Sequence, residues 1–267
     1  MSPHRLAVRW TIGSVSSEGF EALRLSIIGA SRLFGSAAAY VVCVNNVELE
    51  RAKAQCGPVP EFVRWCDVTA QFPVWLRPFL DGRMAEGVGW KFAPLRLFPD
   101  LHELSLDNDC ILWEMPVALE RWLASEEACL LAEDVVAGFG QFAGCCGSQP
   151  RNSGIRGLPP GFDLQRELLK VLERWPVTLT SELDEQGLQT AALSSFDPLV
   201  VTSTEVSICS PFPPHIAQLG TCGAHFVGLN ASWLPWEFMG RPAIEHRRAH
   251  WESVRCAVYE KVGLCGL

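Results

Sequence analysis

Residues 6–55 alternate between two hydrophobic patterns, and this alternation constrains the fold more than any other feature of the chain. Residues 6–12 alternate apolar and polar side chains, and residues 37–44 form a continuous apolar run with β-branched members, so both segments predict strands. Residues 18–33 carry apolar side chains at helical spacing, and residues 47–55 suit a second helix. The order strand–helix–strand–helix is typical of α/β proteins. We therefore expect a mostly parallel central sheet with helices on both faces.

The rest of the chain predicts further elements of both kinds. Helical patterns or helix starts occur at residues 115–125, 162–175, 182–192 and 251–262, and a helix or helix–loop is expected at 92–101. Strand patterns occur at residues 103–106, 130–136 and 199–207. Residues 138–161 are rich in Gly, Pro, Asn and Ser, which predicts a long loop.

Composition and charge limit the class of protein. Hydrophobic residues make up 48% and charged residues 19% of the 267 residues, which is typical of a folded globular protein. No repeat or linker divides the chain, so we expect one domain spanning residues 1–267. The formal charge of −8 argues against a general nucleic-acid binder, which would carry basic patches. Anionic small molecules stay compatible with this charge, because backbone N–H groups and a bound cation can neutralise phosphates locally.

The cysteines and the lengths of the apolar segments indicate where in the cell the protein is located. The eleven cysteines are odd in number and contain no pair of Cys-x-x-Cys hooks, so we expect free thiols in a reducing cytosol. Residues 1–9 lack the apolar core of a signal peptide. The longest apolar stretch, near residues 33–44, is too short to span a bilayer. We expect a cytoplasmic protein without a transmembrane segment.

Two carboxylates and a histidine form the candidate metal site. Asp107 and Asp109 come directly after the predicted strand 103–106, and the carboxyl edge of an α/β sheet is where such folds bind ligands. Two hard oxygen ligands suit Mg²⁺ or Mn²⁺. His225 stands among small residues and can add a neutral imidazole. An Asp-x-Asp turn or a lone His is common without any metal, so the prediction rests on the combination.

Three other segments carry groups suited to a phosphorylated sugar. Lys91 precedes the Asp pair and can neutralise a diphosphate. Residues 152–157, in the predicted loop, offer amides and hydroxyls to sugar hydroxyl groups. Residues 184–187 open a predicted helix, where acidic residues also occur as ordinary helix caps.

Four short motifs occur in a fixed order along the chain. They are Asp107-Asn108-Asp109, Asn152-Ser153-Gly154, Glu185-Gln186-Gly187 and His225-Phe226-Val227-Gly228, followed by Pro235-Trp236. Together with Lys91 this set resembles the retaining glycosyltransferases that include glycogenin and bacterial lipopolysaccharide galactosyltransferases (glycosyltransferase family 8). The resemblance implies a GT-A fold, a nucleotide-diphosphate sugar as donor, UDP-sugars first, and Mn²⁺ or Mg²⁺ as cofactor. It leaves the acceptor open among a saccharide, a lipid-linked molecule and a protein.

The resemblance also implies roles for individual residues. The implied metal ligands are Asp107, Asp109 and His225. The implied catalytic residues near the anomeric carbon are Glu185 and Gln186. The expected donor-binding residues, which include the ends of the first two predicted strands, are Thr11, Ile12, Gly13, Asn45, Lys91, Asn108, Asn152, Ser153, Gly154 and Gly228. Residues 1–110 would then form the nucleotide-binding half, and residues 111–267 the half that binds the sugar and the acceptor.

Two other functions stay open at the level of sequence. A nucleotidyltransferase also joins an α/β sheet to a metal-binding acid pair, but it would carry a basic phosphate loop, and residues 13–17 contain no basic residue. A non-catalytic nucleotide- or sugar-binding protein on the same fold is favoured by Leu234, which stands where the family has a Lys before Pro-Trp. Arg241 is a candidate replacement for that Lys.

Overall fold

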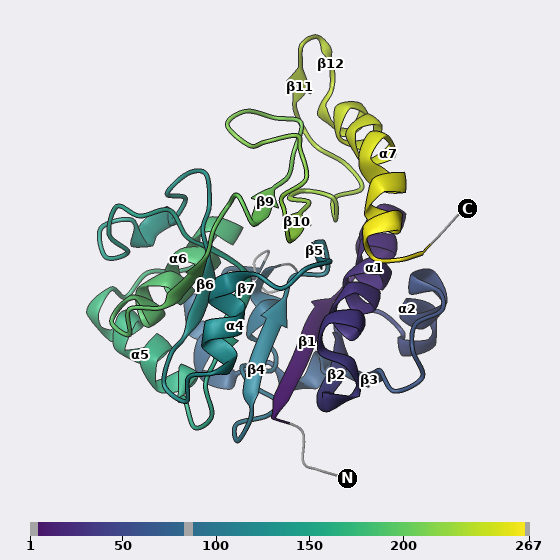
Figure 1. Ribbon diagram of the computed structural model, residues 1–267. Helices are drawn as coiled ribbons and strands as arrows, with labels where there is room; N and C mark the ends of the chain where they lie inside the picture. The colour runs from purple at the N-terminus through teal and green to yellow at the C-terminus, as the bar shows by residue number, and fades with distance from the viewer. Residues whose placement is uncertain (1–4, 83–87, 265–267) are drawn as a thin grey trace.

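The computed structural model describes residues 5–82 and 88–264, and its centre is a seven-stranded sheet (Figure 1). The strand order is β3-β2-β1-β4-β7-β6-β8. These strands are β1 (Leu6–Ile12), β2 (Ala38–Val44), β3 (Arg64–Asp67), β4 (His102–Leu106), β6 (Leu130–Ala132), β7 (Asn152–Leu158) and β8 (Leu199–Val201). β7 runs antiparallel to its neighbours β4 and β6, whereas the other four pairings are parallel. The expected mostly parallel sheet is confirmed.

Helices pack against both faces of this sheet. The α-helices are α1 (Ser17–Phe34), α2 (Leu49–Cys56), α4 (Val117–Leu123), α5 (Leu164–Arg174), α6 (Glu182–Ser194) and α7 (Ala243–Lys261). Short 3₁₀ helices are η1 (Gly35–Ala37), η2 (Thr69–Gln71), η3 (Val74–Phe79), η4 (Val88–Phe92) and η5 (Gly140–Phe142). Successive side chains of a strand point to opposite faces. Accordingly, Leu130 of β6 lies in the core shared with α1 and α4, and Leu131 in the core shared with α5 and α6.

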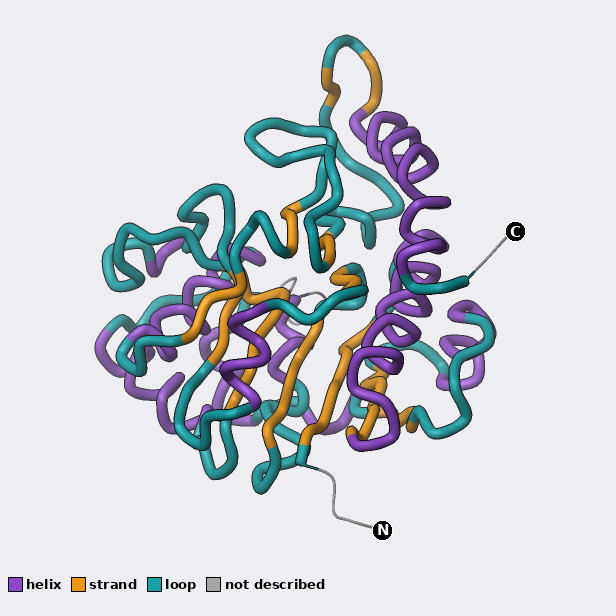
Figure 2. The backbone as a smooth tube through the Cα atoms, in the orientation of Figure 1, coloured by secondary structure: helices purple, strands orange, loops and turns teal. Residues whose placement is uncertain are grey.

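A smaller sheet lies beyond the carboxyl ends of β1 and β4 (Figures 1 and 2). It has the order β5-β10-β9, with β5 (Cys110–Leu112), β9 (Val206–Ile208) and β10 (Gly223–His225). Loops dominate this part of the molecule, and a hairpin of β11 (Glu237–Phe238) and β12 (Arg241–Pro242) projects beyond it. The small sheet is therefore the element that brings C-terminal residues to the edge of the central sheet.

Helix α1 packs against both sheets. It begins after Ser16, whose hydroxyl accepts a hydrogen bond from the Gly19 N–H, as a helix cap does. In its middle, a Cβ added to Gly29 would lie 2.1 Å from the carbonyl oxygen of Leu112, so α1 and β5 can approach each other only because this residue is glycine. The contact fixes the position of β5 and thus of the turn before it.

Several predicted elements need correction. Residues 92–101 form no helix beyond the end of η4, because Pro94 and Pro99 interrupt the segment. The predicted loop 138–161 contains the central strand β7. The predicted strand 199–207 splits into β8 and β9, which belong to different sheets, and the strand 130–136 ends at Ala132. β3, β5, β10, β11 and β12 were not predicted, and the last helix starts at Ala243, well before residue 251.

Two findings bear on the predicted location. In the described part of the chain, no helix is both long and apolar enough to cross a membrane. The ten cysteines within residues 5–82 and 88–264 are free thiols.

Candidate functional site

The pairing of the small sheet brings His225 to the two aspartates. Asp107 and Asp109 lie in the turn between β4 and β5, and His225 is the last residue of β10. β10 pairs with β5 so that His225 lies opposite Cys110, and the N–H of Phe226 donates to the carbonyl of Asp109 at 2.9 Å. The predicted convergence of residues far apart in the chain is confirmed, and strand register is its cause.

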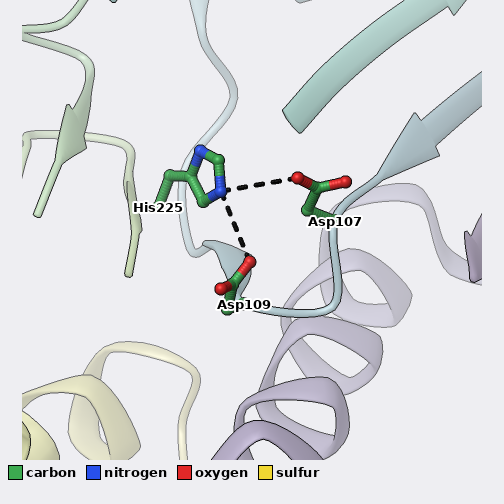
Figure 3. Close-up of side chains that lie close together, drawn as sticks. All are labelled: Asp107, Asp109 and His225. Carbon is green, nitrogen blue, oxygen red and sulfur yellow. Dashed lines mark ion pairs between the residues drawn. The ribbon is translucent and has the colours of Figure 1, made fainter. Parts of the chain in front are cut away.

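The three side chains present their ligand atoms to one point (Figure 3). His225 Nε2 lies 3.3 Å from Asp109 Oδ1 and 3.6 Å from Asp107 Oδ2, and the ligand atoms all lie within 4.8 Å of one another. Asp109 is buried, and apart from the His225 ring its Oδ1 has no polar partner among the described residues. A buried carboxylate oxygen without a donor is costly unless a cation completes it. This donor set of two carboxylates and an imidazole fits a divalent metal ion.

A lysine–glutamate pair, of which the glutamate is buried and the lysine half-buried, adjoins the aspartates. Lys91 Nζ, on η4, lies 2.8 Å from Asp107 Oδ2 and 3.4 Å from Glu185 Oε2. Burial raises the pKa of Glu185 to about 7, with Asp107 adding to the rise and Lys91 opposing it. Burial lowers the pKa of Lys91, but Asp107 and Glu185 outweigh burial, so the net shift is upward and the amine stays charged. The site thus holds a fixed cation beside a carboxyl group that titrates near neutrality.

The same electrostatics act on two of the metal-ligand candidates. Burial raises the pKa of Asp107, but the charges of Lys91 and His225 outweigh it and lower the pKa overall. Burial lowers the pKa of His225, but the contact with Asp109 and the charge of Asp107 outweigh it and raise the pKa. Without a cation, the histidine and the lysine therefore balance the negative charge of the aspartates.

Two further residues hold Glu185, and the sequence motifs predict this role for neither. Gln189 donates from Nε2 to Glu185 Oε1, and Arg156 of β7 donates to Gln189 Oε1. Gln189 is one helical turn after Glu185, and this i,i+4 spacing was the available signal. A small pocket opens between these groups. It is lined by Thr11, Lys91, Ser105, Leu106, Asp107, Ser153, Arg156 and Gln189.

The Asn152-Ser153-Gly154 motif lies on β7, so its predicted place in a loop is wrong. Asn152 Nδ2 donates to Asp134 Oδ2 at 2.9 Å, and Asn152 Oδ1 accepts from the Gly154 N–H at 2.7 Å. Ser153 Oγ lies 3.4 Å from Glu185 Oε2. The serine therefore faces the Lys91–Glu185 pair, whereas the asparagine amide supports the backbone of the strand.

Gly154 makes room for the histidine, which yields a first prediction. A Cβ at this position would lie 2.4 Å from His225 Cε1 and 2.7 Å from Nδ1, so Gly154→Ala must displace the ring. Disturbing the orientation of a metal ligand typically lowers metal affinity roughly 10–100-fold. We expect Gly154→Ala to weaken Mn²⁺ binding at least about tenfold, measured by titration calorimetry. Gly144→Ala, where an added Cβ meets nothing within 4 Å, is the control, and equal affinities in the two variants would refute the steric role of Gly154.

The remaining predicted residues fall into two groups. Gln186 bridges Ser153 and Gly138, accepting from the Ser153 N–H and donating to the Gly138 carbonyl. The amide of Asn108 hydrogen-bonds to the Gly19 carbonyl of α1 and to Asn230. The second group lies at the ends of β1 and β2 and in the turn after β10: Thr11, Ile12, Gly13, Asn45 and Gly228.

Asn45 stands out among the strand-end residues. It is fully buried, and neither polar atom of its side chain has a hydrogen-bond partner within the described residues. The hydroxyl of Thr11 is also buried without a partner there. Buried polar groups are usually paired, so both residues suit an incoming ligand. Arg241, the candidate replacement for the missing Lys, is exposed on β12.

Comparisons with known proteins agree on the fold. No protein-family model matches the sequence, and no curated protein matches it significantly. Among solved structures, the galactosyltransferase LgtC in complex with donor and acceptor sugar analogues aligns with a TM-score of 0.55 at 12% identity, over 98% of this chain and 97% of LgtC. Mouse xyloside xylosyltransferase 1 aligns with a TM-score of 0.50 at 14% identity, over 78% of this chain and 88% of that protein. The bifunctional glycosyltransferase WbbM aligns with a TM-score of 0.52 at 13% identity, over 98% of this chain and 52% of WbbM. The expected GT-A fold of the LgtC type is confirmed.

Proposed function

We propose that the protein is a metal-dependent glycosyltransferase that moves a sugar from a nucleotide-diphosphate donor, UDP-sugars first, to an acceptor. The observation that carries the proposal is the convergence of Asp107, Asp109 and His225 beside the Lys91–Glu185 pair, at the carboxyl edge of the sheet. The alignment with transferases over nearly the whole chain supports it. Residues 1–110 would bind the nucleotide, and residues 111–267 the sugar and acceptor.

The chemistry follows from the charges of the site. The two aspartates and His225 would hold a divalent ion, which would supply Lewis-acid stabilisation to the departing nucleoside diphosphate. Lys91, whose amine lies beside Asp107, would pair with a phosphate of the donor. The unpartnered groups of Thr11 and Asn45 suit the polar edge of a nucleoside.

Glu185 has the chemistry of a residue that acts near the anomeric carbon. It is 1% exposed and held by Lys91, Ser153 and Gln189. The family resemblance implies transfer with retention of configuration. Two routes are compatible with it: same-face attack guided by the leaving phosphate, and a covalent intermediate on the Glu185 carboxylate.

A thermal-shift experiment tests donor and metal together. We expect UDP, and GDP less strongly, to raise the melting temperature in the presence of Mn²⁺ or Mg²⁺ and to have little effect in excess chelator. At a hundredfold excess over Kd, binding to the folded state contributes about 2.7 kcal/mol. Equal stabilisation with chelator would contradict a metal-bridged diphosphate.

The same preparation separates the alternatives. A transferase releases UDP from one member of a panel of UDP-hexoses in a metal-dependent reaction. Pyrophosphate release from UTP with a sugar phosphate would indicate a nucleotidyltransferase. Binding of UDP-sugars without release of UDP, with or without candidate acceptors, would indicate the non-catalytic protein.

A further inference from the structure

A pair of asparagines, Asn108 and Asn230, adjoins the candidate metal site at Asp109 Oδ2, the carboxylate oxygen that does not face His225. Asn230 lies in the turn that follows β10. Its Nδ2 donates to Asp109 Oδ2 at 3.2 Å and to Asn108 Oδ1 at 3.0 Å, and its Oδ1 accepts from Asn108 Nδ2 at 2.6 Å. The two carboxamides thus join side by side through reciprocal hydrogen bonds, and one N–H extends to the aspartate. The proposed metal binding and sugar transfer do not involve these contacts.

The start of helix α1 anchors this amide pair. Asn108 Nδ2 also donates to the Gly19 carbonyl at 3.1 Å, and the Ser16 N–H donates to the Asn230 carbonyl at 3.0 Å. The Ser16 hydroxyl donates to the Leu229 carbonyl at 2.6 Å. A Cβ added to Gly19 would lie 2.6 Å from Asn230 Oδ1, so the helix leaves the amide no space on that side.

A buried arginine holds the same turn from the other side. Arg247 of α7 donates from Nη1 to the Gly228 carbonyl at 2.5 Å and also to the Ala231 carbonyl. The turn carrying Asn230 is therefore fixed between α1 and α7. A side chain on so constrained a backbone has little freedom to leave Asp109.

These contacts make the two oxygens of Asp109 inequivalent. Oδ2 is held by Asn230, whereas Oδ1 faces His225 and is otherwise unpartnered among the described residues. We propose that Asn230 is a positioning residue of the metal centre: it aims Asp109 Oδ1 at the ion, and Asn108 orients Asn230. This inference rests on the proposed metal-dependent function. It gives Asn108 a supporting role in place of the predicted contact with the donor.

The test compares Asn230 variants with a change in the same turn that spares Asp109. Asn230→Ala removes the donor, and Asn230→Leu removes it while keeping the side-chain shape. Ser16→Ala is the control, because it removes the hydroxyl contacts to Leu229 and Gly19 but keeps the Asn230 amide and the Ser16 N–H that holds the Asn230 carbonyl. Mn²⁺ binding is counted from the electron paramagnetic resonance signal of the free aqua ion, with and without UDP, and melting temperatures are recorded alongside.

We expect both Asn230 variants to bind Mn²⁺ roughly 10–100-fold more weakly than the wild type, as is typical when a residue that orients a metal ligand is lost. Ser16→Ala should lower the melting temperature but keep the Mn²⁺ Kd. Wild-type protein that binds no Mn²⁺ would refute the metal centre itself, and so the proposed function.

Three other outcomes would overturn the positioning role alone. The first is wild-type Mn²⁺ affinity in folded Asn230 variants. The second is an equal loss of affinity in Ser16→Ala, which would trace the effect to the turn rather than to the amide. The third is unfolding of both Asn230 variants while Ser16→Ala stays folded, which would make the amide pair a structural element.

Discussion

Asp109→Asn should lower metal-dependent release of UDP from the donor by roughly 10²–10³-fold, the size expected when stabilisation of a departing anion is lost. Asparagine keeps the shape of the side chain and its contact with Asn230 but removes the charge that attracts the ion. Asp109 is only 3% exposed, but an asparagine is tolerated there because its amide keeps Asn230 as a hydrogen-bond partner. We therefore expect a nearly unchanged melting temperature.

Two matched variants sharpen this prediction. Asp107→Asn should have a smaller effect, because Asp107 is more exposed and shares its Oδ2 with Lys91. Asp100→Asn makes the same chemical change at an exposed residue outside the site and should leave turnover as it is. An Asp109→Asn protein with wild-type turnover and an unchanged Mn²⁺ requirement would remove Asp109 from the metal centre.

The parts of the fold that the sequence predicts best are those whose local pattern agrees with their surroundings. β1 and α1 have the periodicity of a strand and of an amphipathic helix, and both pack as that pattern requires. β7 was missed because its small residues serve tertiary contacts. Gly154 leaves room for His225, and a Cβ at Gly157 would lie 2.6 Å from the Trp122 ring. Such a strand looks like a loop until its neighbours are known.

The candidate site likewise contains residues that could be predicted from the sequence and residues that could not. The grouping of Asp107, Asp109 and His225 could be predicted because these residues are chemically distinctive and occur in a family-like order. The residues that contact the site from behind could not. Asn230 contacts Asp109, and Gln189 and Arg156 hold Glu185, through contacts that depend on strand register and on the packing of α1 and α6. Nothing in a single sequence distinguishes an asparagine or glutamine with such a role, and even Asn108, inside a motif, hydrogen-bonds to Gly19 and Asn230.

Glu185→Gln is expected to reduce turnover roughly 10²–10³-fold, the size of effect seen when a group is lost that acts only in the transition state. The carboxyl group is nearly inaccessible to solvent and lies 3.4 Å from the charged Lys91, so its charge acts at short range in a poorly screened site. Glu182→Gln, at an exposed position in the same first turn of α6, is the control and should leave turnover unchanged.

The pH dependence distinguishes a chemical role of Glu185 from a purely structural one. Burial raises its pKa to about 7, so the carboxylate form is present above that pH and lost below it. With saturating Mn²⁺ to keep His225 as a ligand, kcat/KM of the wild type should rise with pH to a plateau, with an apparent pKa at or below about 7.

The free energy of unfolding should respond to pH with the opposite sign. Because the folded state binds the proton more tightly than the unfolded state, this group's contribution falls as pH rises from about 4.5 to about 7. Glu185→Gln should remove both dependences. If it removed only the stability effect and kept the acid limb of kcat/KM, Glu185 would be structural, and the limb would belong to another group of the site.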